Sequence, residues 1–206
     1  MAGTVQDIQS DIAFMKSLAT QGTRAPSIVG AHMVAAGLIY GLCVAAAWAA
    51  MVGLISMSAA WSNTVGLWAT AIYLPVMLWL FWVGRKTPSG AGARAFAAGW
   101  GGIGLSSVTI LVTLVVVGLR LKNPTFVAHA WPPVAFALYG GAWLTFTVAS
   151  RRPAWILVSL GAYGTAIVIS ALTGDPALWL AFAAGLILWM AAPGAVLMWQ
   201  GRRPAG

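Results

Sequence analysis

The side chains that most often carry chemistry are scarce in this sequence. It contains two histidines, one cysteine and three acids, namely His32, His129, Cys43, Asp7, Asp11 and Asp175. Each histidine lies just inside one end of an apolar run, His32 in the first and His129 in the fourth, where an ionisable group is the usual indication of function. The two runs place them near opposite faces of a layer roughly 30 Å thick. The histidines are therefore two separate candidates for cofactor binding and cannot share one haem iron or metal ion.

The other polar and ionisable residues argue against catalysis. No carboxylate, lysine or arginine lies at mid-depth of an apolar run. This argues against an acid-based proton relay and excludes a retinal Schiff base, which needs a lysine at that depth. Cys43 has no second cysteine for a metal site, and no serine, histidine and acid form a nucleophilic set. We therefore expect a non-enzyme without metal or cofactor. A polar path made of hydroxyl groups stays open, from Tyr40, Tyr73, Tyr139, Tyr163, Ser106, Ser107 and Thr113.

Composition places the chain in a lipid environment. Apolar residues make up 61% of it and charged residues 7%, against about 25% charged residues in soluble domains. The net charge of +8 does not indicate nucleic-acid binding, because the basic residues are spread over short loops instead of forming one stripe. The lipid bilayer is the expected partner.

Six apolar runs have the roughly 20 residues that a membrane-crossing helix needs. They cover residues 28–54, 59–83, 94–118, 126–149, 153–172 and 177–199. Pro153 and Pro176 are expected at first helical positions, and Asp175 as an N-cap. The sequence therefore predicts an all-α fold, an integral membrane bundle of six transmembrane helices.

Charge and tryptophan placement predict the orientation. Nine of the eleven basic residues fall on one side of six spans: Lys16, Arg24, Arg85, Lys86, Arg94, Arg151, Arg152, Arg202 and Arg203. Arg120 and Lys122 fall on the other. The positive-inside rule then gives N-in and C-in. Belt tryptophans map to both interfaces, with Trp82, Trp155 and Trp199 at the inner one.

Three regions follow from this topology: a cytoplasmic amphipathic segment (residues 1–25), a six-span domain (26–200) and a cytoplasmic tail (201–206). Within the first, apolar residues recur at helical spacing from Val5 to Ala19. This short helix is expected to dock on its own bundle or the membrane, or to contact another protein.

Glycine spacing predicts close helix contacts. The run Gly99 to Gly104 matches G-x-G-x-x-G, but it has neither the preceding strand nor the later acid of a dinucleotide site. Gly37 and Gly41 form a G-x-x-x-G pair, and Ala98 and Gly102 a similar small-residue pair. Such pairs let helices approach closely, within one chain or between two.

Prolines inside the spans predict kinks. Pro75 lies in the second span, Pro132 and Pro133 at the start of the fourth, and Pro193 in the sixth. Trp68 and Trp189 lie deep in their spans, where they could pack or border a cavity together with the kinks at Pro75 and Pro193. Similar short sequences occur in the two halves, at Leu38 to Gly41 and at Ala137 to Gly140. The two three-helix halves could therefore form an inverted repeat.

Three segments resemble stretches of small six-helix bacterial membrane proteins, a group with no assigned function. They are Phe136 to Trp143, Ala181 to Met198 with its Ala-Pro-Gly at 192–194, and Asp11 to Met15 before Arg24-Ala25-Pro26. The resemblance implies a multi-pass protein of the bacterial inner membrane and no particular chemistry.

Two functions therefore stay open. The first is a non-catalytic membrane subunit or regulatory accessory protein, which associates with another membrane protein or with itself through its small-residue faces. The alternative is a small carrier or binder of an apolar molecule, with a cavity at mid-membrane depth.

Overall fold

The computed structural model describes residues 25–58, 61, 64–85, 91–123 and 125–202. The amphipathic segment and most of the tail predicted from the sequence lie outside these residues. Within them all regular structure is helical, and six helices are long and apolar enough to cross a membrane. The predicted all-α fold with six candidate spans is therefore confirmed.

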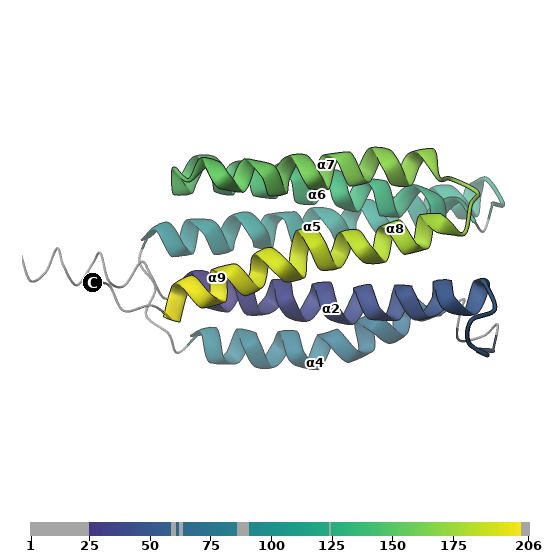
Figure 1. Ribbon diagram of the computed structural model, residues 1–206, viewed down its shortest axis with the longest axis horizontal. Helices are drawn as coiled ribbons and strands as arrows, with labels where there is room; N and C mark the ends of the chain where they lie inside the picture. The colour runs from purple at the N-terminus through teal and green to yellow at the C-terminus, as the bar shows by residue number, and fades with distance from the viewer. Residues whose placement is uncertain (1–24, 59–60, 62–63, 86–90, 124, 203–206) are drawn as a thin grey trace, which may run out of the picture.

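The helices run back and forth along one axis (Figure 1). The first three candidate spans are α2 (Ala25–Met51), α4 (Val65–Arg85) and α5 (Ala91–Arg120). The fourth is α6 (Phe126–Ser150), and the fifth joins the 3₁₀ turn η1 (Pro153–Trp155) to α7 (Ile156–Ala171). The sixth is continuous but changes type twice: α8 (Ala177–Leu186), the π-helical turn η2 (Ile187–Ala191) and α9 (Ala192–Arg202).

Local chemistry explains two helix boundaries. The first span was expected to reach residue 54 but ends at Met51, because Gly53 adopts φ +78° and turns the chain. The Gly53 and Leu54 N–H groups then bond back to the Ala50 and Ala49 carbonyls, at 3.1 and 2.8 Å, which is a Schellman motif. The sixth span begins at Ala177, one residue later than the start expected at Pro176, which instead takes the N-cap position. Asp175 Oδ1 still accepts the Ala177 N–H at 2.7 Å, so its carboxylate satisfies a free donor at the start of α8.

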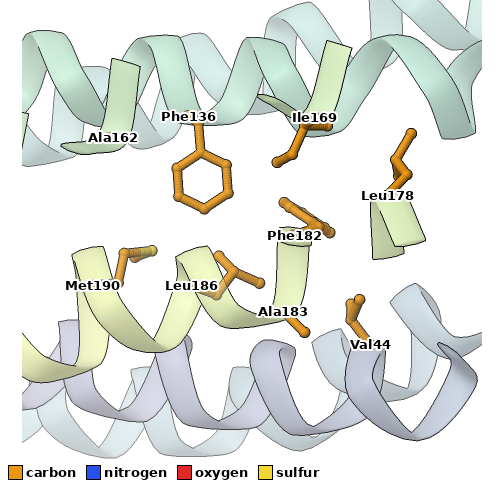
Figure 2. Close-up of a cluster of buried hydrophobic side chains, with 9 residues drawn as sticks. All are labelled: Val44, Phe136, Ala162, Ile169, Leu178, Phe182, Ala183, Leu186 and Met190. Atoms are coloured by element: carbon orange, nitrogen blue, oxygen red, sulfur yellow. The ribbon is translucent and has the colours of Figure 1, made fainter. Parts of the chain in front are cut away.

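The sixth span forms the centre of the bundle. It packs on α2 along its length and on α7 through α8 and η2, while α6 pairs with α7. Figure 2 shows its side chains meeting those of α2, α6 and α7 in one apolar cluster. The cluster consists of Val44, Phe136, Ala162, Ile169, Leu178, Phe182, Ala183, Leu186 and Met190. By contrast, α4 packs mainly on α2 and α5 mainly on α6, so both are peripheral.

Glycines bring α2 and the sixth span into backbone contact. A Cβ added at Gly30 would lie 2.6 Å from the Gly194 carbonyl oxygen, and one at Gly37 would lie 2.6 Å from the Ala191 nitrogen. A Cβ at Gly41 would meet the Ile187 side chain at 3.0 Å. The two helices therefore touch through at least three glycine positions on one face of α2, the close approach that small residues permit.

Gly37→Ala is expected to lower the free energy of unfolding by about 1–3 kcal/mol, because the new methyl group meets backbone that has to shift. Titration of the detergent-solubilised protein with SDS, followed by tryptophan fluorescence, measures this change. The matched control is Gly164→Ala on α7, where a Cβ meets nothing within 4 Å; stability there should be unchanged or raised. Equal effects of the two substitutions would contradict the close contact.

Candidate functional site

The two histidines lie at opposite ends of the bundle. His32 is near the start of α2, and His129 is in the first turn of α6, which begins at the other end. Both are half-buried. Within the described residues no group of three or more His, Cys, Asp or Glu side chains could hold a metal ion. Each histidine therefore has to be considered on its own.

His32 belongs to a small polar cluster between α2 and α4. Its Nδ1 lies 3.5 Å from the Tyr73 hydroxyl, the outer limit of a hydrogen bond. Thr70 donates its hydroxyl proton to the Gly66 carbonyl, so the Tyr40 hydroxyl is the donor in its 2.8 Å bond to Thr70 Oγ1. The Tyr40 and Tyr73 rings meet edge to face, with centroids 5.8 Å apart.

This cluster joins two of the tyrosines that the sequence offered for a polar path, Tyr40 and Tyr73. Tyr139 of α6 packs against the apolar cluster of Figure 2, whereas Tyr163 lies with its ring against Gly140. The described side chains in the cluster pair with one another across helices. Hydroxyls and an imidazole at such a position hold α4 to α2, and each such bond contributes roughly 0.6 kcal/mol in membrane proteins.

The second polar feature lies at η2 and follows from Pro193. Proline has no N–H, so the Trp189 carbonyl four residues earlier loses its α-helical donor. The Ala192 N–H bonds to the Ile187 carbonyl, five residues back, which gives the π-helical turn. The Trp143 indole N–H from α6 then donates to the Trp189 carbonyl at 2.9 Å. The freed acceptor is therefore satisfied by a side chain of another helix.

Aromatic packing holds the Trp143 indole in place. Trp143 is completely buried. Its ring stacks on Trp155, with centroids 5.2 Å apart and planes 8° apart, and meets the Trp100 ring edge to face at 5.6 Å. Trp155, expected at the membrane interface, is thus buried in this stack. Such aromatic pairs contribute about 0.5–1.5 kcal/mol beyond the area that they bury.

Trp189 itself fills a site made by a glycine. Its indole lies so close to α7 that a Cβ at Gly161 would be 2.4 Å from the ring, and its Nε1–H donates to Thr165 Oγ1 at 2.8 Å. Gly140 and Gly185 accommodate the Tyr163 and Phe136 rings in the same way. The surroundings of Trp189 are therefore packed by aromatic rings against glycines.

Trp68 was also expected to lie deep in its span, but α4 begins at Val65, so Trp68 lies in its first turn. It is on α4, 43% exposed, stacked on Trp61 with centroids 4.3 Å apart, and its Nε1–H donates to Thr64 Oγ1 at 3.0 Å. Figure 1 places α4 and α7 on opposite sides of the bundle. Pro193 is buried beside Trp189, and Pro75 is exposed on α4. The four residues expected around one cavity thus form two separate pairs.

The small-residue pairs also differ in their surroundings. Gly37 and Gly41 face the sixth span, as described above. A Cβ at Gly102 would meet nothing within 4 Å, and the same holds at Gly99, Gly101 and Gly104. The Ala98 side chain lies outside the described residues. These four glycines of α5 therefore have open space beside them, whereas Gly37 and Gly41 of α2 have a helix beside them.

Comparison of the chain with protein-family models, with curated proteins and with solved structures finds no match in any of the three. Function must therefore be argued from the residues. The described interior offers hydroxyls, one imidazole and indole N–H groups, which can hold helices together or donate hydrogen bonds.

Trp143→Phe is expected to lower the free energy of unfolding by about 1–3 kcal/mol, because it leaves the buried Trp189 carbonyl without its donor. The SDS titration measures this loss as well. In a Pro193→Ala background the same substitution should cost less, since the new backbone N–H can serve that carbonyl. A double-mutant cycle separates this coupling from the loss of indole volume.

Trp68→Phe is the matched control, because it removes an indole N–H bond on an exposed face. Its effect should stay within about 0.5 kcal/mol. If Trp143→Phe costs the same with and without Pro193, the bond to the Trp189 carbonyl contributes nothing to stability.

Proposed function

We propose that this chain is a multi-pass protein of the bacterial cytoplasmic membrane that acts as a non-catalytic membrane subunit or accessory protein. The observation that carries the proposal is the exposed outer face of α5. Only 6% of the most apolar part of α5 is buried in the chain, against 50% for the sixth span. An apolar helix with so few contacts in its own chain is suited to packing against lipid or another membrane helix.

The proposed orientation keeps both ends in the cytoplasm. Arg85, Arg151 and Arg152 lie at the end of the bundle where α2 starts and α9 finishes, and Arg120 and Lys122 lie at the opposite end. Arg152 also donates to the Gln200 side chain at 2.7 Å, which joins the loop after α6 to the end of the sixth span. The positive-inside rule supports placing this arginine-rich end in the cytoplasm.

Reporter fusions test this orientation. A fluorescent protein that folds only in the cytoplasm is expected to fluoresce after Gln200, whereas alkaline phosphatase, active only outside, should be active after Asn123. The reverse pattern would overturn the N-in, C-in proposal. Exchanging each reporter for the other at the same position controls for differences in expression.

The outer face of α5 carries two exposed glycines three residues apart, whereas the exposed face of α7 has one, Gly164. The outer face of α5 comprises Gly101, Gly104, Leu105, Val108 and Val112, all exposed. Ile103, Ser107, Ile110, Leu111 and Leu114, on the opposite side of the helix, are less exposed. Because small residues in membrane helices permit close approach of backbones, open space beside Gly101 and Gly104 favours an associating helix over lipid alone.

Photocrosslinking in native membranes tests this association. A photoreactive amino acid at Leu105 or Val112 is expected to give a crosslink to a second polypeptide, because both side chains lie on the outer face of α5. Val148 and Leu157, which are 73% and 68% exposed on α6 and α7, are the matched control sites. Gly101→Leu should abolish the α5 crosslink. Products limited to lipid at all four sites would contradict the subunit proposal.

The alternative proposal is a carrier or binder of an apolar molecule. The positions of Trp68 and Trp189 do not support one cavity bordered by both, so such a molecule would have to bind elsewhere. The nearest comparable feature among the described residues is the cluster of Tyr40, Tyr73 and His32. The Tyr73 hydroxyl, at the outer limit of a hydrogen bond to His32, could donate to a carbonyl group there instead. A coloured or ultraviolet-absorbing small molecule that co-purifies in mild detergent would favour this alternative.

A further inference from the structure

A hollow of about 400 Å³ lies beside the hairpin that joins α5 to α6. Its apolar lining comes from Val115, Gly118 and Leu119 of α5 and Val127 of α6, with Lys122 and Asn123 at its rim. The hollow therefore combines a surface for a hydrocarbon chain with polar groups at the level where the candidate span ends.

The charge at this rim is distinctive in the chain. Lys122 and Arg120 are both exposed, and among the described residues they are the two basic side chains at this end of the bundle. The Asp175 carboxylate at the same end is engaged in capping α8 through the Ala177 N–H. Asn123 Oδ1 accepts from the Thr125 N–H and hydroxyl, at 3.1 and 2.9 Å, so its amide N–H₂ is the group left to a ligand. The rim thus offers donors and positive charge.

The turn itself does not require a lysine. Lys122 has φ +51°, and the Asn123 and Lys122 N–H groups bond to the Gly118 and Leu119 carbonyls at 3.0 and 3.2 Å. This is the Schellman motif that ends α2, where Gly53 occupies the equivalent position. Glycine would adopt this conformation with less strain. The Lys122 ammonium group beside the hollow therefore does not stabilise the backbone of this turn.

We propose that this hollow binds an anionic phospholipid. One acyl chain lies against Val115, Leu119 and Val127, and the phosphate faces the Lys122 ammonium, with Arg120 contributing charge. The apolar lining complements the acyl chain of such a lipid, and the cationic rim complements its negative headgroup. A zwitterionic lipid, which has no net charge, would gain less binding free energy from the rim. The proposal rests on insertion in a membrane, and it is independent of the subunit role and of any contact through the outer face of α5.

Native mass spectrometry of the full chain in mild detergent tests the proposal. The protein is titrated with phosphatidylglycerol or phosphatidylcholine of identical acyl chains, and the apparent Kd of the first bound lipid is compared. Phosphatidylglycerol is expected to bind at least about fivefold more tightly, from roughly one basic residue's contribution. Lys122→Gln should remove most of this preference, and Val115→Phe, which fills the hollow, should weaken the binding of both lipids.

Arg151→Gln is the matched control. Arg151 is also an exposed basic residue with positive φ, +53°, at the end of a helix, but it is not part of this hollow. Its substitution should leave the lipid preference intact. Lys122→Gly is a second variant that should still fold, because glycine relieves the backbone strain at this position. It should keep or raise thermal stability and lose the preference for phosphatidylglycerol.

Three results would overturn the proposal. The first is equal affinity for the two lipids, and the second is an unchanged preference in both Lys122 variants. The third is displacement of bound phosphatidylglycerol by inorganic phosphate alone at the same concentration, which would mean that the rim binds phosphate without a contribution from the hollow. The reporter and crosslinking experiments measure insertion and association separately, so failure here leaves those proposals standing.

Discussion

Backbone contact between α2 and the sixth span is the constraint on which the rest of the bundle depends. With no charged group at mid-depth of the candidate spans, close packing and hydrogen bonds have to hold the helices together. Gly30, Gly37 and Gly194 bring the two backbones together. The sixth span then has its other faces free for α6 and α7. The Phe136 ring of α6 lies against Gly185 of the sixth span, and the Trp189 ring of the sixth span lies against Gly161 of α7. The peripheral positions of α4 and α5 follow from this central pair.

Pro193 lies next to this contact and shows how a local defect is resolved by tertiary structure. Its missing N–H would leave the Trp189 carbonyl unsatisfied in an apolar interior, which is costly. The helix widens to a π turn, and an indole from α6 supplies the donor. Trp143 can reach that carbonyl because it is fixed by Trp155 and Trp100. A proline of the sixth span and a stack of tryptophans from other helices thus form one arrangement.

The helices could be predicted from sequence because each depends on a local signal. Length and apolar composition located all six spans, and the boundary residues Pro153 and Asp175 behave as their chemistry predicts. Boundaries shifted where one residue adopted positive φ, as Gly53 does at the end of α2.

The contacts between helices were harder to predict, because small residues indicate closeness without naming a partner. Gly37 and Gly41 lie against the sixth span, whereas Gly102 meets nothing in its own chain. Trp68 and Trp189 were both expected deep in their spans, but Trp68 lies in the first turn of α4 on an exposed face, and Trp189 lies mid-span against Gly161. Hydropathy cannot distinguish these cases, because lipid and protein interior are both apolar.

The glycines differ in whether another part of the chain fills the space beside them, and this difference indicates where the chain could contact its surroundings. Gly30, Gly37 and Gly194 meet backbone, and Gly140, Gly161 and Gly185 meet aromatic rings. Gly101 and Gly104 of α5, like Gly164 of α7, have nothing of the described chain within 4 Å of an added Cβ. In the middle of a helix a glycine that contacts nothing lowers stability by about 0.5–1 kcal/mol relative to alanine. Gly101 and Gly104 carry this cost without a contact in their own chain. A second helix placed against α5 would use them as α9 uses Gly30, and the described chain shows no other compensation for them.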